Sequence, residues 1–479
     1  MDLNRYDNPL SVRYASAEMS YLFSPHKKFT TWRRLWLALA EAEQELGLGI
    51  PDAALRQIRE HLDDVDLDLA DRYERRFRHD VMAHIHALGD QAPEARPYLH
   101  LGATSAFVTD NAELIIMRDA LRLLLGRLIA ILATLESFAR RTKDLPCLAY
   151  THFQPAQLTT VGKRAVLWMQ DFALDMEVLC ERLEGLRFRG CKGTTGTQAS
   201  FVDLFAGDHD KVRELERRIS AKLGFTDLFP VTGQTYPRKQ DSMVLDSLSG
   251  IAQSSAKLAG DLRLLQHEGE LFEAFETDQI GSSAMAYKRN PMRAERISGL
   301  ARFVMALPAN TAHTAASQWL ERSLDDSANR RLVLPEAFLA SDAILVLIAN
   351  VIAGLEVGED MIRQHVNREM PFMATERWLM QAVAAGGDRQ TLHDVIRRHS
   401  LAVAEAVQAG APNDLLARLA GDPAFHGVSE PTLQAELDPH RFVGRAPQQV
   451  EEFLGDYLHP LLERARKLAT IPEVAEVTV

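Results

Sequence analysis

The chain has 479 residues, of which 46% are hydrophobic and 25% are charged, and a chain of this kind forms roughly two to four compact units with substantial cores. Its 27 glycines and 20 prolines are fewer than an average protein would contain, which favours helices over turn-rich folds. The net charge of −12 excludes a general positive field that would attract nucleic acid. We therefore expect no nucleic-acid partner, and we expect any anionic ligand to be bound by local arginines.

The number of cysteines and the lengths of the apolar runs indicate in which cellular compartment the protein lies. Three cysteines are too few for a disulfide framework, and residues 1–10 lack the apolar segment of a signal peptide. The longest uncharged apolar run, residues 343–355, is shorter than the roughly 18 residues that a membrane span needs. The sequence therefore predicts a cytosolic protein without a membrane segment.

The N-terminal part predicts two helices. Residues 30–47 place Trp32, Leu35 and Leu39 at three- and four-residue steps, with Thr at the start and Gly at the end, which is typical of a helix. A second, more polar helix is predicted to run without a break through residues 75–90. Prolines at 93 and 97 and a glycine at 102 then interrupt the pattern, so we expect a domain boundary near residue 104.

The middle of the chain predicts long helices with few breaking residues, over residues 111–144, 158–185, 238–268, 292–307 and 334–355. Periodic patterns of this length favour a helical bundle, so the fold class is all-α. Such rods rarely bury all their apolar faces within one chain, which predicts a homo-oligomer, by symmetry a dimer or a tetramer.

Shorter helices and turn residues return after residue 358 and predict a third helical domain. We find no alternating strand pattern of useful length, and residues 190–198 are the one place left open for short strands.

The common motifs for zinc hydrolysis, P-loop nucleotide binding and α/β-hydrolase chemistry are absent. Three histidines, His79, His84 and His86, are close in sequence, but on one continuous helix their spacing does not bring them to a single ion. We therefore expect no metal site. His79, between Arg78 and Asp80, is a candidate for a polar role, against the alternative of a satisfied structural histidine.

A second histidine lies in the segment 151–157, where the chain is expected to bend at Pro155 before a long helix begins. A loop histidine that a rigid helix positions can act as a general acid or base near neutral pH. The alternative is that His152 only caps the helix, and the spacing does not decide between the two.

The segment 280–296 combines a glycine and two serines with Lys288, Arg289 and the helix start at Asn290 and Pro291. Positive charge before a helix N-terminus suits an anion or a developing enolate-like carboxylate. A solvated basic loop is the alternative. Further along, Arg322, Arg330 and Arg331 surround two aspartates, which suits either carboxylate and phosphate binding or a structural ion-pair network.

These segments together resemble a known family. The stretch GSSAMAYKRNP, residues 281–291, is similar to the signature loop of the fumarase/aspartase superfamily. Other segments resemble the adenylosuccinate lyase family within it, and they lie at residues 11–16, 78–84, 100–105, 151–164, 192–201, 233–236, 324–331 and 371–376.

The resemblance implies a three-domain helical fold with domains at residues 1–104, 105–357 and 358–479. It also implies a homotetramer in which three chains build each active site. The implied reaction is the elimination of fumarate from adenylosuccinate, giving AMP, and from the purine intermediate SAICAR, giving AICAR, without a cofactor or a metal.

By the same resemblance His152 is the general acid and Ser282 the general base, and Ser283 is not excluded as the base. Lys288 and Asn290 are available donors that would stabilise the serine alkoxide and the carbanion's carboxylate. The family pattern assigns substrate binding to Arg13, Tyr14, Arg78, His79, Asp80, Thr104, Ser105, Gln234, Lys288, Asn290, Arg296, Arg322, Ser327 and Arg331.

One position departs from the family pattern, because Ala286 stands where the superfamily usually has proline. We expect this change to loosen the loop and to affect its closing rate more than its chemistry. Two other functions remain open: a sister lyase acting on argininosuccinate or aspartate, and a structural protein without activity. The segments at 78–84, 192–201 and 324–331 count against the first, and the presence of both His152 and Ser282 counts against the second.

Overall fold

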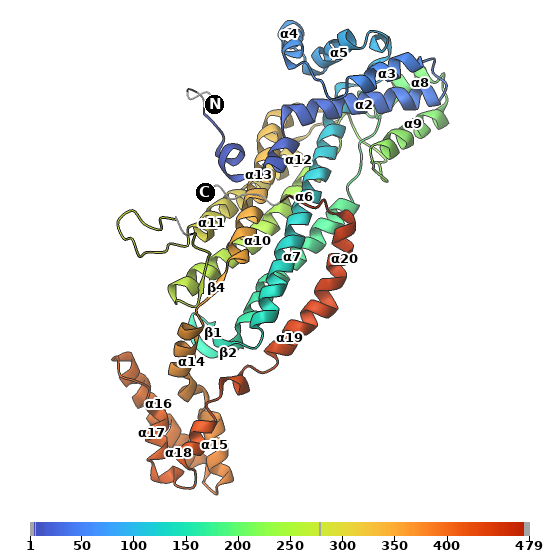
Figure 1. Cartoon of the computed structure of the whole chain (residues 1–479). Helices are drawn as coiled ribbons and strands as arrows, with labels where there is room; N and C mark the ends of the chain where they lie inside the picture. Colours follow the sequence, from blue (N-terminus) through green and yellow to red (C-terminus); the bar gives the residue numbers. More distant parts are fainter. Residues whose placement is uncertain (1–3, 5, 277–278, 474–479) are drawn as a thin grey trace.

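A computed structural model describes residue 4 and residues 6–276 and 279–473 of the chain. The fold is mostly helical, as expected, and its longest helices lie side by side in one elongated bundle (Figure 1). The bundle helices are α6 (Ser105–Thr142), α7 (Val161–Glu184), α10 (Lys239–His267), α11 (Met292–Ala306) and α13 (Asp326–Ala353).

Helix α6 shows why these segments form rods. Gly126 is its only glycine, it has no proline, and closely spaced Leu and Ile side chains along it are buried in the core. At 1.5 Å per residue, its 38 residues span about 57 Å. The two ends of α6 therefore belong to different regions of the molecule.

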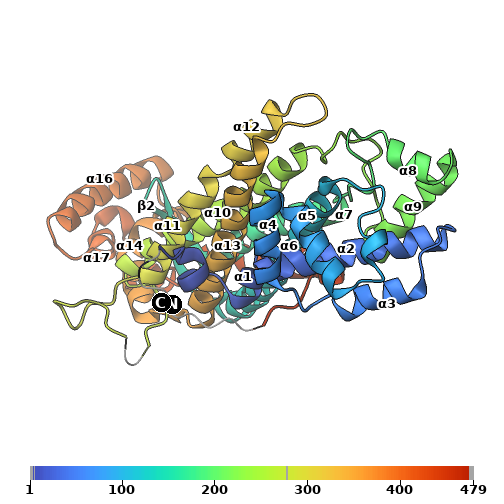
Figure 2. The ribbon, with the colours of Figure 1, turned by 90° about the horizontal axis from the view of Figure 1, so that it is seen from above.

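The N-terminal elements cover one end of the bundle. They are η1 (Leu10–Tyr14), α1 (Ala17–Leu22), α2 (Pro25–Glu45), α3 (Asp52–Glu60), α4 (Leu67–Phe77), α5 (Asp80–Gln91) and η2 (Arg96–Tyr98). From the middle of the chain, α9 (His209–Lys222) packs on α2, and α8 (Ala199–Leu204) lies beside α9 (Figure 2). The short α12 (Pro308–Ser317) lies between α11 and α13.

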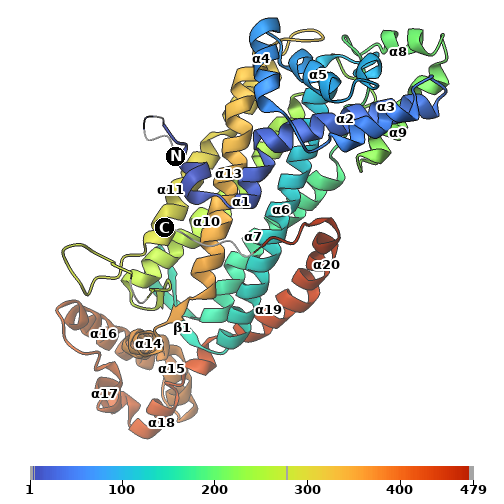
Figure 3. The same ribbon diagram turned by 45° about the horizontal axis from the view of Figure 1, so that its top comes forward.

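The C-terminal helices form a second, smaller core at the opposite end of the bundle. They are α15 (Thr375–Ala384), α16 (Arg389–Gln408), α17 (Leu415–Ala420), η3 (Pro423–Phe425), α18 (Glu430–Ala435) and η4 (Pro439–Phe442). Helix α14 (Glu359–Met373) precedes them, and its buried side chains belong to the larger core. The chain then returns along α6 and α7 through α19 (Ala446–Glu452), η5 (Phe453–Leu458) and α20 (His459–Leu468) (Figure 3).

The larger core includes buried side chains from both sides of residue 104, and α6 begins at Ser105. The division into three domains at residues 104 and 357 stays a prediction.

Two small antiparallel sheets interrupt the helices. Strands β1 (Pro146–Thr151) and β2 (Gln154–Thr160) form a hairpin, and β3 (Leu271–Phe272) pairs with β4 (Glu356–Val357). The hairpin replaces the simple bend expected at residues 151–157. A proline inside β2 and a turn without Asn or Gly hid the hairpin from the sequence pattern. The glycine-rich residues 190–198, left open for strands, form a loop.

Two predicted helix bounds are wrong. The helix expected through residues 75–90 is broken, because Arg78 adopts a left-handed backbone (φ 56°) that ends α4, and His79 caps α5. The helix expected from residue 334 already begins at Asp326 and accommodates Pro335 in its interior. Both errors affect residues that line the candidate site.

Helix α13 is long and apolar enough to cross a membrane, with a mean hydropathy of 2.1 over its most apolar window. However, 78% of that window is buried inside the protein. Helix α13 also contains the buried Asp342, which forms an ion pair with Arg127 of α6. These features are those of a core helix of the bundle.

Candidate active site

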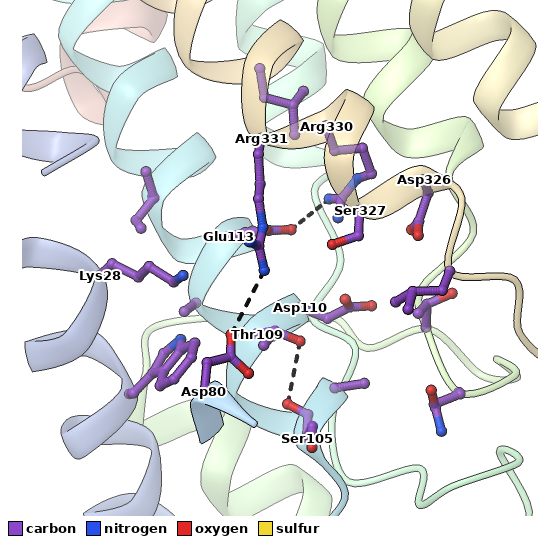
Figure 4. Close-up of a pocket in the computed structure, with 18 of the residues that line it drawn as sticks. Lys28, Asp80, Ser105, Thr109, Asp110, Glu113, Asp326, Ser327, Arg330 and Arg331 are labelled. Carbon is purple, nitrogen blue, oxygen red and sulfur yellow. Dashed lines mark hydrogen bonds and ion pairs between the residues drawn. The ribbon is translucent and has the colours of Figure 1, made fainter. Parts of the chain in front are cut away.

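A cavity of about 730 Å³ opens where the N-terminal helices meet the bundle. Helix α2, the junction of α4 and α5, the first turns of α6, the segment before α10 and the start of α13 line it (Figure 4). The sequence-predicted residues among its lining are Arg78, His79, Asp80, Thr104, Ser105, Gln234, Arg322, Ser327 and Arg331. Segments more than 200 residues apart in the sequence therefore supply one cavity.

The junction between α4 and α5 presents His79 to this cavity. Its Nδ1 accepts a hydrogen bond from the Met82 N–H at 3.3 Å, which leaves the proton on Nε2 in the neutral ring. Nε2 lies 3.4 Å from the Ser105 hydroxyl, at the start of α6. A neutral His79 is therefore oriented as a hydrogen-bond donor toward the cavity.

The floor of the cavity is a buried network of ion pairs. Arg238 lies 3.0 Å from Asp110 and 2.7 Å from Asp326, and Arg330 lies 2.7 Å from Asp241 and 2.6 Å from Glu113. Burial alone would raise the pKa of the Asp110 carboxyl, but Arg238, Arg330 and Arg189 together outweigh burial and hold that pKa below its usual range. The network keeps the Asp110 carboxylate charged and ties the start of α13 to α6 and to the start of α10.

The first turns of α13 and the segment just before it carry cationic and hydroxyl side chains toward the cavity. Ser327 lies on the first turn and Arg331 one turn further, where its guanidinium is 3.7 Å from Asp80 (Figure 4). Arg322, just before the helix, pairs with Asp326 at 2.8 Å. Arg331 is 66% exposed, so its guanidinium keeps donors available for an anion.

The sequence missed several lining residues, namely Lys28, Thr109, Asp110, Glu113, Arg238 and Asp326. Most of them belong to the ion-pair network, and only the three-dimensional pairing of α6 with α13 reveals it. For Lys28, a lysine followed by aromatic residues one and four positions later was a signal in the sequence.

The remaining predicted residues lie outside this cavity. Arg13 and Tyr14 are on η1, which packs along α13 beyond the cavity. Lys288 and Asn290 are on the loop between α10 and α11, with Ser282, and Arg296 is on the second turn of α11. His152 is at the turn of the β1–β2 hairpin.

The hairpin that carries His152 is anchored at its base by a buried carboxylate. The fully buried Glu270 accepts a hydrogen bond from the Tyr150 hydroxyl at 3.4 Å, lies 3.0 Å from Nδ1 of His365 on α14, and lies 3.5 Å from Arg164 on α7. At the exposed turn, His152 and Phe153 both have left-handed backbones, with φ of 54° and 57°. The anchored strands of the hairpin therefore hold a turn whose backbone is strained.

The loop at residues 279–291 folds around Ser282. The Ser282 Oγ accepts backbone hydrogen bonds from the Met285 N–H at 3.1 Å and the Ala284 N–H at 3.4 Å. Hydrogen bonds to the oxygen favour the deprotonated form of the Ser282 hydroxyl. Asn290 Nδ2 donates to the Gly281 carbonyl at 2.8 Å and closes the loop.

Gly281 is required where the two ends of this loop cross. A Cβ at residue 281 would lie 2.1 Å from the Lys288 carbonyl oxygen, so a larger residue would force the loop open. The effect of Ala286 on the closing rate of the loop stays a prediction.

Comparisons with known proteins decide the family. A model described as "Lyase" matches residues 32–306, and one described as "Adenylosuccinate lyase C-terminus" matches residues 371–453. The adenylosuccinate lyase of Schizosaccharomyces pombe is 47% identical over 99% of both chains, and that of Saccharomyces cerevisiae is 48% identical over 97% of both. The chain belongs to the adenylosuccinate lyase family.

Solved structures with the same fold share less of their sequence with this adenylosuccinate lyase family member. The 3-carboxy-cis,cis-muconate lactonizing enzyme of Pseudomonas putida has a TM-score of 0.80 at 23% identity and covers 96% of this chain and 100% of its own. A fumarate lyase from Mesorhizobium has a TM-score of 0.78 at 23% identity, with 94% and 99% covered. These likenesses confirm the fold class.

The two candidates for proton transfer, His152 and Ser282, lie away from the cavity and away from each other. The cavity lies at the N-terminal end of α6, and the His152 hairpin follows the C-terminal end of the same helix. The Ser282 loop lies between the far end of α10 and the start of α11 (Figure 1). Within one chain these three groups do not form a single site.

Proposed function

We propose that this protein eliminates fumarate from adenylosuccinate, giving AMP, and from SAICAR, giving AICAR, as a step of purine nucleotide synthesis. Membership of the adenylosuccinate lyase family supports the reaction. The observation that carries the substrate class is the cavity, in which Arg331, Arg78 and the His79 Nε2–H can bind the phosphate and carboxylates of such a molecule.

In the proposed reaction, Ser282 acts as the base and removes a proton from the succinyl Cβ. The electron pair of that C–H bond forms the double bond of fumarate, and the C–N bond breaks. His152 gives a proton to the departing nitrogen on the opposite face. Two backbone N–H donors at the Ser282 oxygen support the alkoxide that this step requires.

The proposed assembly is a homotetramer in which different chains supply the cavity, the hairpin and the Ser282 loop. The separation of the three groups along α6 and α10 supports this arrangement. No metal or cofactor has a role in the proposed chemistry. A cytosolic location is proposed on the cysteine content, and all three cysteines are free and buried.

The direct test is turnover by the purified full-length protein. We expect adenylosuccinate to be converted to equal amounts of AMP and fumarate, measured by the change in ultraviolet absorbance and by chromatography. SAICAR should give AICAR under the same conditions. Consumption of argininosuccinate with adenylosuccinate untouched would instead identify a sister lyase.

A further inference from the structure

Lys28 of α2 differs from the four arginines of the cavity that form ion pairs. Arg238, Arg322, Arg330 and Arg331 each pair with a carboxylate. For Lys28, no ion pair or hydrogen bond of its ammonium group exists within the described ranges, although the residue lines the cavity.

The carboxylates that face Lys28 are largely committed to arginines. Asp80 lies 3.7 Å from Arg331, and Glu113 lies 2.6 Å from Arg330. Glu74 and Arg331 complete the charged groups that act on the ammonium. Figure 4 shows the side chain reaching from α2 toward Glu113 and the Asp80–Arg331 pair.

Aromatic rings hold the ammonium of Lys28 in place. Its Nζ lies 4.9 Å from the centre of the Trp32 ring and 5.1 Å from that of Phe29. Trp32 is fully buried, so the cation is held against a rigid surface. Burial lowers the pKa of Lys28, and the neighbouring Asp80 partly opposes that effect.

A partly desolvated cation with uncommitted N–H donors, held against a rigid wall beside a second cation, is suited to an anionic oxygen. We propose that Lys28 is a further substrate-binding residue, whose ammonium contacts an anionic oxygen of the bound nucleotide together with Arg331. This inference deepens the proposed function and rests on its substrate class. The anion is either the phosphate monoester or a carboxylate of the succinyl group.

The test compares Lys28→Met, which keeps the hydrocarbon over Trp32 and removes the charge, with Lys28→Arg, which keeps a cation. Lys27→Met is the matched control, because Lys27 is the adjacent residue of the same helix and its partner Asp119 remains paired with Arg118. Dissociation constants of AMP, adenosine and fumarate are measured by calorimetry on each full-length protein. Circular dichroism establishes that the variants are folded.

If the phosphate is the ligand, Lys28→Met should weaken AMP binding about 10- to 100-fold, as expected for one charged hydrogen bond. Adenosine binding should not change, and Lys28→Arg should restore most of the affinity. If a carboxylate is the ligand, fumarate binding should weaken instead. Unchanged binding of both AMP and fumarate in a folded Lys28→Met protein would overturn the assignment, as would an equal loss in Lys27→Met.

The binding measurements do not depend on turnover, so the two proposals fail separately. A wild-type protein that binds AMP but leaves adenylosuccinate intact would overturn the proposed reaction and not the role of Lys28. Full turnover with unchanged ligand binding in Lys28→Met would overturn only Lys28.

Discussion

At the scale of single residues, the two residues of the β1–β2 turn have different roles: His152 would carry the proton, and Phe153 carries most of the backbone strain. Histidine tolerates the left-handed backbone better than a bulky residue does, so the strain of the turn is concentrated at Phe153. The Phe153 ring packs at 5.9 Å from that of Tyr150, which is tied to Glu270. The turn is therefore held in shape from its base, and its exposed imidazole is free to meet a substrate.

We expect His152→Asn to lower kcat by about 10²- to 10⁴-fold, the usual contribution of a general acid, because asparagine keeps the left-handed turn but supplies no proton at neutral pH. The melting temperature should stay close to that of the wild type. Phe153→Asn is the control, since it changes the turn and retains the imidazole. A His152→Asn protein with nearly wild-type kcat would remove this residue from the mechanism.

A second residue-scale prediction concerns Glu43 of α2. Its carboxyl group is fully buried, and neither oxygen has a hydrogen-bond partner among the residues that the structure describes. Burial raises the pKa of Glu43 from 4.5 to about 9, so the folded protein holds the neutral acid at neutral pH. The unfolded chain releases this proton above pH 4.5, which favours unfolding increasingly as the pH rises toward about 9.

Glu43→Gln cannot titrate, so its gain in melting temperature over the wild type should be larger at pH 8 than at pH 6. The underlying gain in the free energy of unfolding is up to about 1.4 kcal/mol per pH unit. Scanning calorimetry at one fixed protein concentration measures the difference. A gain of equal size at both pH values would mean that Glu43 is ionised in the folded protein.

At the scale of elements, the packing of α7 on α6 limits what can occupy Gly162. A Cβ at this position would lie 2.3 Å from the Ala139 carbonyl oxygen and 2.7 Å from the Lys143 backbone. Both helices also lead directly into the hairpin, α6 before β1 and α7 after β2. The absence of a side chain at Gly162 therefore fixes both the helix contact and the position of the His152 turn.

Gly162→Ala should destabilise the protein by about 1–3 kcal/mol through overpacking, although alanine is the better helix former. It should also lower kcat, because the hairpin shifts with the helix ends. Gly260→Ala in α10 is the control, since nothing lies within 4 Å of a Cβ there. Thermal unfolding and the adenylosuccinate assay measure both effects. Equal stability of the Gly162→Ala and wild-type proteins would contradict the close packing.

The elements also show what the sequence could and could not predict. The long periodic helices were predicted because dozens of residues repeat one pattern, and their bounds mostly agree within a few residues. The break at Arg78 was missed because a left-handed arginine carries no local signal. The early start of α13 was missed because buried ion pairs to Asp326 and Arg330 outweigh the penalty of an internal Pro335.

The candidate site was predicted unevenly for a similar reason. Residues in family motifs, such as His79 and Arg331, were identified and do line the cavity. Glu113 was missed because its importance arises only when α6 packs beside α13, and Lys28 was missed although aromatic residues follow it at helical spacing. Glu43 was also missed, since its position among charged residues of α2 gave no sign that it faces the core.

At the scale of the whole molecule, one chain holds its cavity and its His152 turn at opposite ends of a helix about 57 Å long. A shared site predicts that two inactive variants can repair each other. His152→Asn and His79→Ala, each inactive alone, should regain activity when mixed, dissociated and reassembled. Random reassembly gives intact sites in up to about a quarter of cases.

Mass spectrometry of the assemblies would establish subunit exchange and the number of chains. The control is a mixture of His152→Asn with His152→Ala, which damages the same segment twice and should stay inactive. Absence of recovery after demonstrated exchange would place each complete site within one chain.

The distance between the cavity and the hairpin also has a genetic consequence. In an organism that carries two differently damaged copies of this gene, the residual activity would depend on which segments are damaged and not only on how severely. Two lesions at opposite ends of α6 would leave some mixed assemblies with undamaged sites, whereas two lesions at the same end would leave none. The geometry of one helix would then influence how inherited variants combine.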